Sequence, residues 1–127
     1  MSFSSELKDH LTVAAITGYV NDRIYPLLRD EGAALPAVVY TIVSLDPQGN
    51  LDGIDGSQRQ YRVQIDCWSR TYDEMDLLAL AVRDRMNTAA TNFKTVFQPG
   101  SGFDEYESET KLYRRSADYS CWFKEVP

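Results

Sequence analysis

The side chains with the clearest capacity for chemistry lie in "LDPQGNLDGIDGSQ", Leu45–Gln58, a long stretch between two strand-like runs. It holds oxygen ligands that calcium accepts, set among glycines: Asp46, Asn50, Asp52 and Asp55. An EF-hand loop needs acids at alternating positions, then a glycine, and a glutamate at its twelfth position. Counting from Asn50 places Ile54 where an acid belongs, and no glutamate follows in the required place. The spacing therefore does not predict a calcium site.

A second group of acids lies in "PGSGFDEYESET", as Asp104, Glu105, Glu107 and Glu109. Four carboxylates in six residues could form an acid–base pair or a metal cluster. Catalytic carboxylates normally sit in a rigid, partly buried pocket, so a solvated loop is the favoured interpretation of this segment. Asp66 alternates onto the outward face of a strand, where it either meets solvent or forms a salt bridge to a neighbouring subunit.

The chain has a single histidine, His10, on which any Ser/His/Asp or Cys/His arrangement would depend. It lies beside Leu7 and Ala14 of a predicted helix, and packing is favoured over catalysis because no partner can be named. Cys67 and Cys121 fall in strand-like runs and are predicted to be buried thiols rather than a disulfide. No paired metal-ligand spacing and no phosphate-binding glycine pattern is present. The sequence therefore predicts no catalytic site, no metal and no cofactor.

Length and composition are those of one ordinary globular domain over residues 1–127, with 43% hydrophobic and 25% charged residues. No run approaches the roughly 20 apolar residues of a membrane span, and the start lacks a secretion signal, so we expect a cytosolic protein. A net charge of −6 argues against a nucleic-acid surface, which needs clustered Lys and Arg. The densest basic group, "YRR", lies within a strand-like run and is interpreted as a solvated strand face.

Helix signals occur in two places. A first helix is predicted to begin at Ser4 or Ser5, to run through "ELKDHLTVAAI" and to stop at Gly18. The strongest helix is "TYDEMDLLALAVRDRMNTAA", where Thr71 and Glu74 form a capping box. Its predicted buried stripe consists of Met75, Leu78, Ala79, Val82 and Met86.

Strand signals occupy most of the remaining chain. A short edge segment is expected at 23–25, strands at 37–45 and 59–69, a strand in "NFKTVFQ", and a long last strand in "KLYRRSADYSCWFKEV". Tyr61, Val63, Ile65 and Cys67 alternate toward the core, as do Ala117, Tyr119, Cys121 and Phe123. We therefore predict an α+β fold with two helices on one face of a four- to five-stranded, mostly antiparallel sheet.

Two long loops, at about 46–58 and 99–110, remain without a predicted structure. Loops of this length in a small domain are usually functional or disordered. Both are glycine-rich and have few large apolar residues, so a partner surface would have to order them. The residues predicted to take part in assembly are those of the two loops and of the strand at 59–69: Asp46, Asn50, Leu51, Asp52, Ile54, Asp55, Asp66, Trp68, Phe103, Asp104, Glu105, Tyr106 and Glu107.

Several segments in a fixed order also resemble a known family. They are "VNDRIYPLL", "LPAVVYTIVS", "YRVQIDCWSRTYDEM" and "LALAVRDRM", which extend from about Val20 to Met86. In this combination they look like the tail-completion or tail-terminator proteins of long-tailed bacteriophages. The resemblance extends loosely to the last strand and includes no catalytic signature.

The resemblance implies a structural protein of the virion tail, assembled in the bacterial host cytoplasm. Such proteins form a ring, commonly a hexamer, on the head-proximal end of the tail tube. The ring ends polymerisation of the major tail tube protein and offers a surface to head–tail connector proteins, while DNA passes through its bore without specific binding. On this interpretation Leu45–Gln58 is an arm that orders against a neighbouring subunit or the tube.

Two other functions remain open at this point. One is a neck or head-closure connector, which would bind the portal side and leave tube length uncontrolled. The other is a small hydrolase or ligand-binding domain, which would need a deep concave site around His10 or Asp66.

Overall fold

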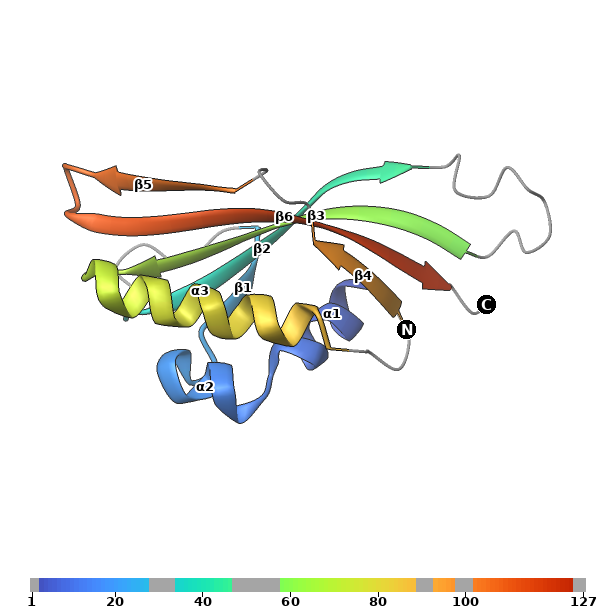
Figure 1. Cartoon of the computed structure of the whole chain (residues 1–127), viewed down its shortest axis with the longest axis horizontal. Coiled ribbons are helices and arrows are strands. Elements are labelled where there is room, and N and C mark those ends of the chain that lie inside the picture. The colour runs from blue at the N-terminus through green and yellow to red at the C-terminus, as the bar shows by residue number, and fades with distance from the viewer. Residues whose placement is uncertain (1–2, 28–33, 47–57, 89–92, 98–101, 125–127) are drawn as a thin grey trace.

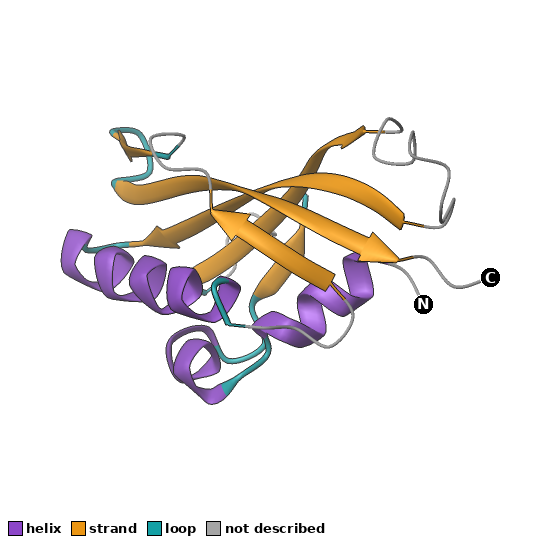
Figure 2. Cartoon of the chain, turned by 45° about the vertical axis from the view of Figure 1, so that its right-hand side comes forward, coloured by secondary structure: helices purple, strands orange, loops and turns teal. Residues whose placement is uncertain are grey.

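Three helices cover one face of a twisted six-stranded sheet in the computed structural model, which describes residues 3–27, 34–46, 58–88, 93–97 and 102–124 (Figures 1 and 2). The helices and strands are α1 (Phe3–Leu11), α2 (Ala14–Val20), β1 (Ile24–Pro26), β2 (Ala37–Asp46), β3 (Gln58–Ser69), α3 (Tyr72–Met86), β4 (Phe93–Phe97), β5 (Phe103–Glu107) and β6 (Leu112–Lys124). The α+β class and the placement of the helices on one face are as predicted.

The sheet has the order β1-β2-β3-β6-β4, and β5 also pairs with β6. Only β1 and β2 run parallel; the other pairs are antiparallel. β4 and β5 follow one another along the same edge of β6, with β4 opposite Tyr119–Phe123 and β5 opposite Leu112–Ser116. The long strand β6 therefore has two halves with different neighbours.

The core lies between the helices and the sheet. Alternate residues of β3 and β6 enter it as predicted, with Val63, Ile65, Tyr119 and Phe123 at most 2% exposed. α3 buries Met75, Leu78, Val82 and Met86, and its N-cap Thr71 accepts a hydrogen bond from the Glu74 backbone. These positions follow the predicted periods of two and 3.6 residues.

The predicted first helix is in fact two helices, so the chain has three in the described residues rather than two. The break falls at Thr12 and Val13, and Val13 is extended with φ −132° and ψ 156°. Both residues are β-branched and lose side-chain freedom in a helix. The prediction that Gly18 ends the helix is wrong: Gly18 lies inside α2, and Asn21 follows its end with φ 53°. Asparagine tolerates a positive φ better than most residues do.

The prediction of a loop at 99–110 is also wrong in part, because Phe103–Glu107 forms β5. Local propensity gave no sign of it, since Asp and Glu are poor strand formers. The strand forms because β6 places arginines directly opposite its acids: Asp104 pairs with Arg115 and Glu105 with Arg114. Opposite charges facing each other across two strands stabilise the pairing. This sixth strand enlarges the predicted sheet.

Candidate assembly surface

The β5–β6 hairpin and the start of α3 form the most distinctive surface of the described residues. A tight turn joins the two strands: the Lys111 backbone donates to the Glu107 carbonyl at 2.8 Å, and the Thr110 hydroxyl donates to the Glu107 carboxylate at 2.6 Å. Lys111 adopts φ 59°, a left-handed conformation that the turn imposes on a residue other than glycine. The turn thereby sets the register that brings acids opposite arginines.

Arg115 fixes the helix-side face of the hairpin. Its Nε and Nη2 donate to the two carboxylate oxygens of Asp104 at 2.7 and 3.1 Å, and its Nη1 donates to Asp76 of α3 at 2.6 Å. Tyr72 of α3 donates its hydroxyl proton to Asp104 at 3.0 Å. Bidentate arginine–carboxylate pairs fix orientation as well as charge. One guanidinium thus connects β5, β6 and α3.

The ionisation of this cluster follows from its hydrogen bonds. The bonds from Arg115 hold the pKa of the Asp104 carboxyl below its usual range, although partial burial acts in the opposite direction. The same bond to Asp104 raises the pKa of Arg115. Both groups stay charged at neutral pH, so Asp104 is poorly suited to carry a proton in catalysis. The cluster is a structural ion pair.

Three tyrosines extend this face toward the tip of the hairpin. The rings of Tyr72 and Tyr113 meet edge-on, with centroids 5.9 Å apart and an interplanar angle of 83°. Those of Tyr106 and Tyr113 are 4.8 Å apart. Tyr72 is 45% exposed and Tyr106 is 50% exposed. The hairpin therefore presents aromatic surface that the chain itself leaves half uncovered.

Arg114 holds the opposite face of the β5–β6 hairpin, as Arg115 holds the helix-side face. Its guanidinium lies 5.3 Å from the ring centroid of Trp68 and 5.4 Å from that of Phe103, which is itself 50% exposed. It also forms ion pairs with Glu105 at 3.0 Å and with Asp66 at 3.7 Å. Its Nε is buried and makes no hydrogen bond with any described residue. Arginine stacked between aromatic rings keeps its charge while covering apolar surface.

Asp66 lies on the predicted outward face, but the expectation that it meets solvent is wrong, because it is only 6% exposed. It accepts a hydrogen bond from the Gln64 amide at 3.2 Å, and its ion-pair partner is Arg114 of the same chain. Interpreting "YRR" as a solvated strand face is wrong for the same reason: Arg114 and Arg115 are held in ion pairs and are only partly exposed.

Seven of the residues predicted to take part in assembly come together in this hairpin region: Asp66, Trp68, Phe103, Asp104, Glu105, Tyr106 and Glu107. Asp46 lies apart from them, at the end of β2. The remaining five lie outside the described residues: Asn50, Leu51, Asp52, Ile54 and Asp55. Sequence reasoning missed Arg114 and Arg115, for which the usable signal was a doublet of arginines shortly after a run of acids.

The residues considered for catalysis serve packing. His10 is 7% exposed; its Nε2 donates to the Arg85 carbonyl at 2.8 Å, and Arg85 donates back to the His10 carbonyl at 2.6 Å. Burial lowers the pKa of His10 and raises that of the Cys67 thiol to about 12.

Among the described residues, no three His, Cys, Asp or Glu side chains converge as metal ligands. No described helix is long and apolar enough to cross a membrane.

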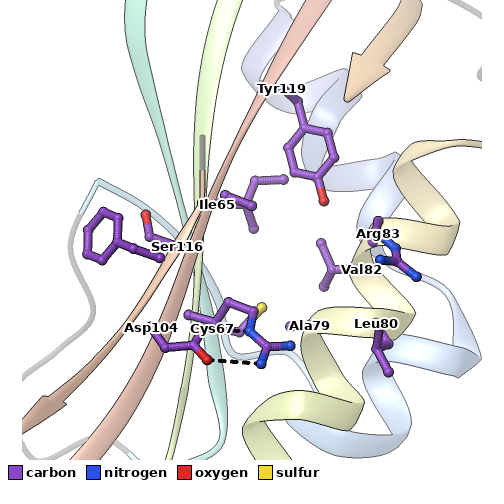
Figure 3. A pocket seen from close by; sticks show the side chains of 13 residues that line it. Ile65, Cys67, Ala79, Leu80, Val82, Arg83, Asp104, Ser116 and Tyr119 are labelled. Atoms are coloured by element: carbon purple, nitrogen blue, oxygen red, sulfur yellow. Dashed lines mark hydrogen bonds and ion pairs between the residues drawn. The ribbon is translucent and has the colours of Figure 1, made fainter. Parts of the chain in front are cut away.

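A pocket of about 410 Å³ lies between α3 and the sheet, beside the start of β5 (Figure 3). Neither His10 nor Asp66, the residues around which a hydrolase site was expected, lines this pocket. Its wall consists instead of buried core side chains such as Ile65 and Val82.

Comparison with known proteins connects this architecture to a family. The family model described as "Tail completion protein gp17" matches residues 6–124. A solved chain from the "Virion of native gene transfer agent (GTA) particle" is similar with a TM-score of 0.63 and 12% sequence identity, over 98% of this chain and 96% of that chain. No curated protein matches the chain in sequence. The structural similarity shows a shared fold.

Proposed function

The chain belongs to the tail completion protein gp17 family and is a structural component of a bacteriophage tail, and from that premise we propose that it forms a ring capping the head-proximal end of the tail tube. The ring ends polymerisation of the tube and provides the surface to which the head joins. Its partners are further copies of the chain, most simply in a hexamer, together with the major tail tube protein and head–tail connector proteins. The function is binding, without catalysis.

The observation that carries this proposal is the half-exposed aromatic surface of the β5–β6 hairpin. Phe103 and Tyr106 are each 50% exposed on opposite faces of one strand, and arginines hold that strand from both sides. Aromatic side chains are enriched in protein interfaces. A rigid strand loses little conformational freedom on binding, which favours association. The hairpin therefore suits contact with a neighbouring subunit.

The arrangement of surfaces also favours a ring over a twofold dimer. The hairpin lies at one end of the sheet, whereas β2 ends and β3 begins at the other end (Figure 1). Contacts between two different surfaces are heterologous and close into a ring when the rotation per subunit permits. An acidic chain with net charge −6 would give such a ring a bore that repels DNA phosphates.

The test is the solution mass by light scattering over a range of concentration and salt, with electron micrographs of the same samples and of purified tail tubes. We expect rings, or a monomer that forms rings on tube ends. The double variant Phe103→Ser and Tyr106→Ser should fold and fail to cap tubes. The matched control is Leu77→Ser, which removes a 52%-exposed apolar side chain from α3 and should cap normally.

A chain that ignores tube ends but binds the portal side of the head would overturn the capping function and favour the neck connector. Normal capping by the double variant would remove the hairpin from the interface.

A further inference from the structure

We propose that the pocket between α3 and the sheet binds the loop between β2 and β3 of a second copy of this chain, through one of the loop's two aliphatic–aspartate pairs. This inference rests on the proposed ring and names the contact that joins its subunits. The occupant is residues 47–57, which contain Leu51-Asp52 and Ile54-Asp55.

The pocket lies at an interruption of the sheet edge. β4 pairs with β6 as far as Tyr119, and β5 begins opposite Ser116, so Ala117 and Asp118 have no strand partner on that edge among the described residues. Gly102 enters this gap so closely that a Cβ there would lie 2.7 Å from the Ser116 carbonyl oxygen. Beside this gap lies a volume of about 410 Å³, enough for an aliphatic side chain.

The wall of the pocket is apolar, and its rim carries Arg83 on the α3 side. Ile65, Cys67 and Val82 line it and are at most 2% exposed. Leu80 and Arg83 extend from α3, and Asp104 lies across the pocket from them (Figure 3). A ligand that fits has an apolar group for the wall and a negative charge for the rim.

Arg83 is the available charge on that rim. Arg115 is shared between Asp104 and Asp76, whereas the exposed Arg83 guanidinium makes no hydrogen bond or ion pair with any described residue. Two aspartates and no basic residue occur in 47–57, each aspartate directly after an aliphatic residue. An aliphatic–aspartate pair thus matches the pocket in both hydrophobicity and charge.

The distance along the sheet keeps the loop of the same copy from Ile65 and Cys67 on the pocket wall. The loop leaves the sheet at Asp46 and returns at Gln58, opposite Lys124. Ile65 and Cys67 on the pocket wall are seven and nine residues further along β3, roughly 23 to 30 Å away at about 3.3 Å per residue. Eleven residues that go out and back reach about 19 Å. That suffices for the near end of the pocket at Tyr119, which is opposite Val63 and roughly 17 Å along β3, but not for Ile65 and Cys67. The loop therefore meets the pocket of the next copy, a heterologous contact.

The first test measures binding of a fluorescent peptide of residues 46–58 to the full chain by anisotropy. We expect saturable binding, weakened about tenfold or more by Leu51→Ser and Ile54→Ser in the peptide, because an aliphatic burial is lost. Arg83→Glu in the protein should weaken binding about fivefold, and a peptide with Asp52→Lys and Asp55→Lys should restore it. Lys8→Glu, the same charge reversal on exposed α1, should change nothing.

The second test places one cysteine on each side of the contact. Leu80→Cys in one preparation and Ile54→Cys in another should give a disulfide-linked heterodimer under mild oxidation when the two are mixed. Neither preparation alone should give that species. The native Cys67 and Cys121 are buried and serve as an internal control for unfolding.

The outcomes separate this inference from the proposed ring. Rings without peptide binding and without the heterodimer overturn the pocket contact and leave the ring standing. Peptide binding that Arg83→Glu weakens, in a chain that never forms rings on tubes, supports the pocket contact and overturns the ring.

Discussion

The two halves of β6 are stabilised in different ways. The half opposite β4 carries Tyr119, Cys121 and Phe123, which are at most 2% exposed and pack under the helices. The half opposite β5 carries Arg114 and Arg115, whose ion pairs hold the hairpin from its two faces. Apolar burial is strong and insensitive to salt, whereas partly exposed ion pairs are weak and screened. The core half is therefore built for stability and the hairpin half for a defined, half-exposed surface.

The largest difference in unfolding free energy is expected between substitutions of two phenylalanines in the same sheet, one buried and one half-exposed. Phe123→Ala removes a buried ring that contacts Phe3 and Tyr61, and should lower the unfolding free energy by about 3–5 kcal/mol in a urea titration. Phe103→Ala removes a ring that is 50% exposed and should cost less than about 1 kcal/mol. Equal costs would show that the two halves do not differ as described.

The second-largest effect on stability is expected at Gly102, beside the point where the two halves of β6 meet. Gly102→Ala would bring a Cβ to 2.7 Å from the Ser116 carbonyl, and relieving this clash should cost about 1–3 kcal/mol. Gly18 in α2 has nothing within 4 Å of a Cβ, so Gly18→Ala should instead stabilise the protein by about 0.5–1 kcal/mol. Thermal unfolding of both variants would show shifts of opposite sign; a neutral Gly102→Ala would mean that β5 can move away from β6.

A smaller effect is expected from the ion pairs. Arg115→Met removes the partners of Asp104 and Asp76 and should cost about 1–2 kcal/mol, since both carboxylates are partly exposed and screened. Arg83→Met, on the same side of α3, removes a charge that has no ion-pair partner among the described residues and should be neutral. The cost of Arg115→Met should shrink in high salt. A cost that salt does not change would assign Arg115 a packing role.

The smallest effect is a dependence on pH. The pKa of Asp104 is lowered in the folded chain, so its contribution is present above its unfolded pKa of about 4 and is lost as pH falls through the folded value. The difference in unfolding free energy between the wild type and Arg115→Met should therefore narrow, by under about 1 kcal/mol, from pH 5 to pH 2. A constant difference across this range would contradict the ion pair.

The sequence predicts the core half of β6 better than the hairpin half. Residues of the core half, such as Tyr119 and Phe123, were placed correctly because alternation over a long apolar strand leaves one face to bury. In the hairpin half, Asp66 was assigned to the right face but to the wrong environment, and β5 was missed. Asp104 and Glu105 are poor strand formers by themselves. The residues that stabilise them, Arg115 and Arg114, lie on the next strand, beyond the hairpin turn.

The sequence by itself determined the α+β class, the core faces of the long strands and α3, and the family resemblance, because these depend on local periodicity and on an ordered set of segments. Only the tertiary structure decided that Arg114 and Arg115 hold β5 from its two faces, that Asp66 is covered, and that a pocket opens where β4 gives way to β5. The physical reason is that pairing energy depends on which side chains face each other across strands, and register is a property of the folded sheet.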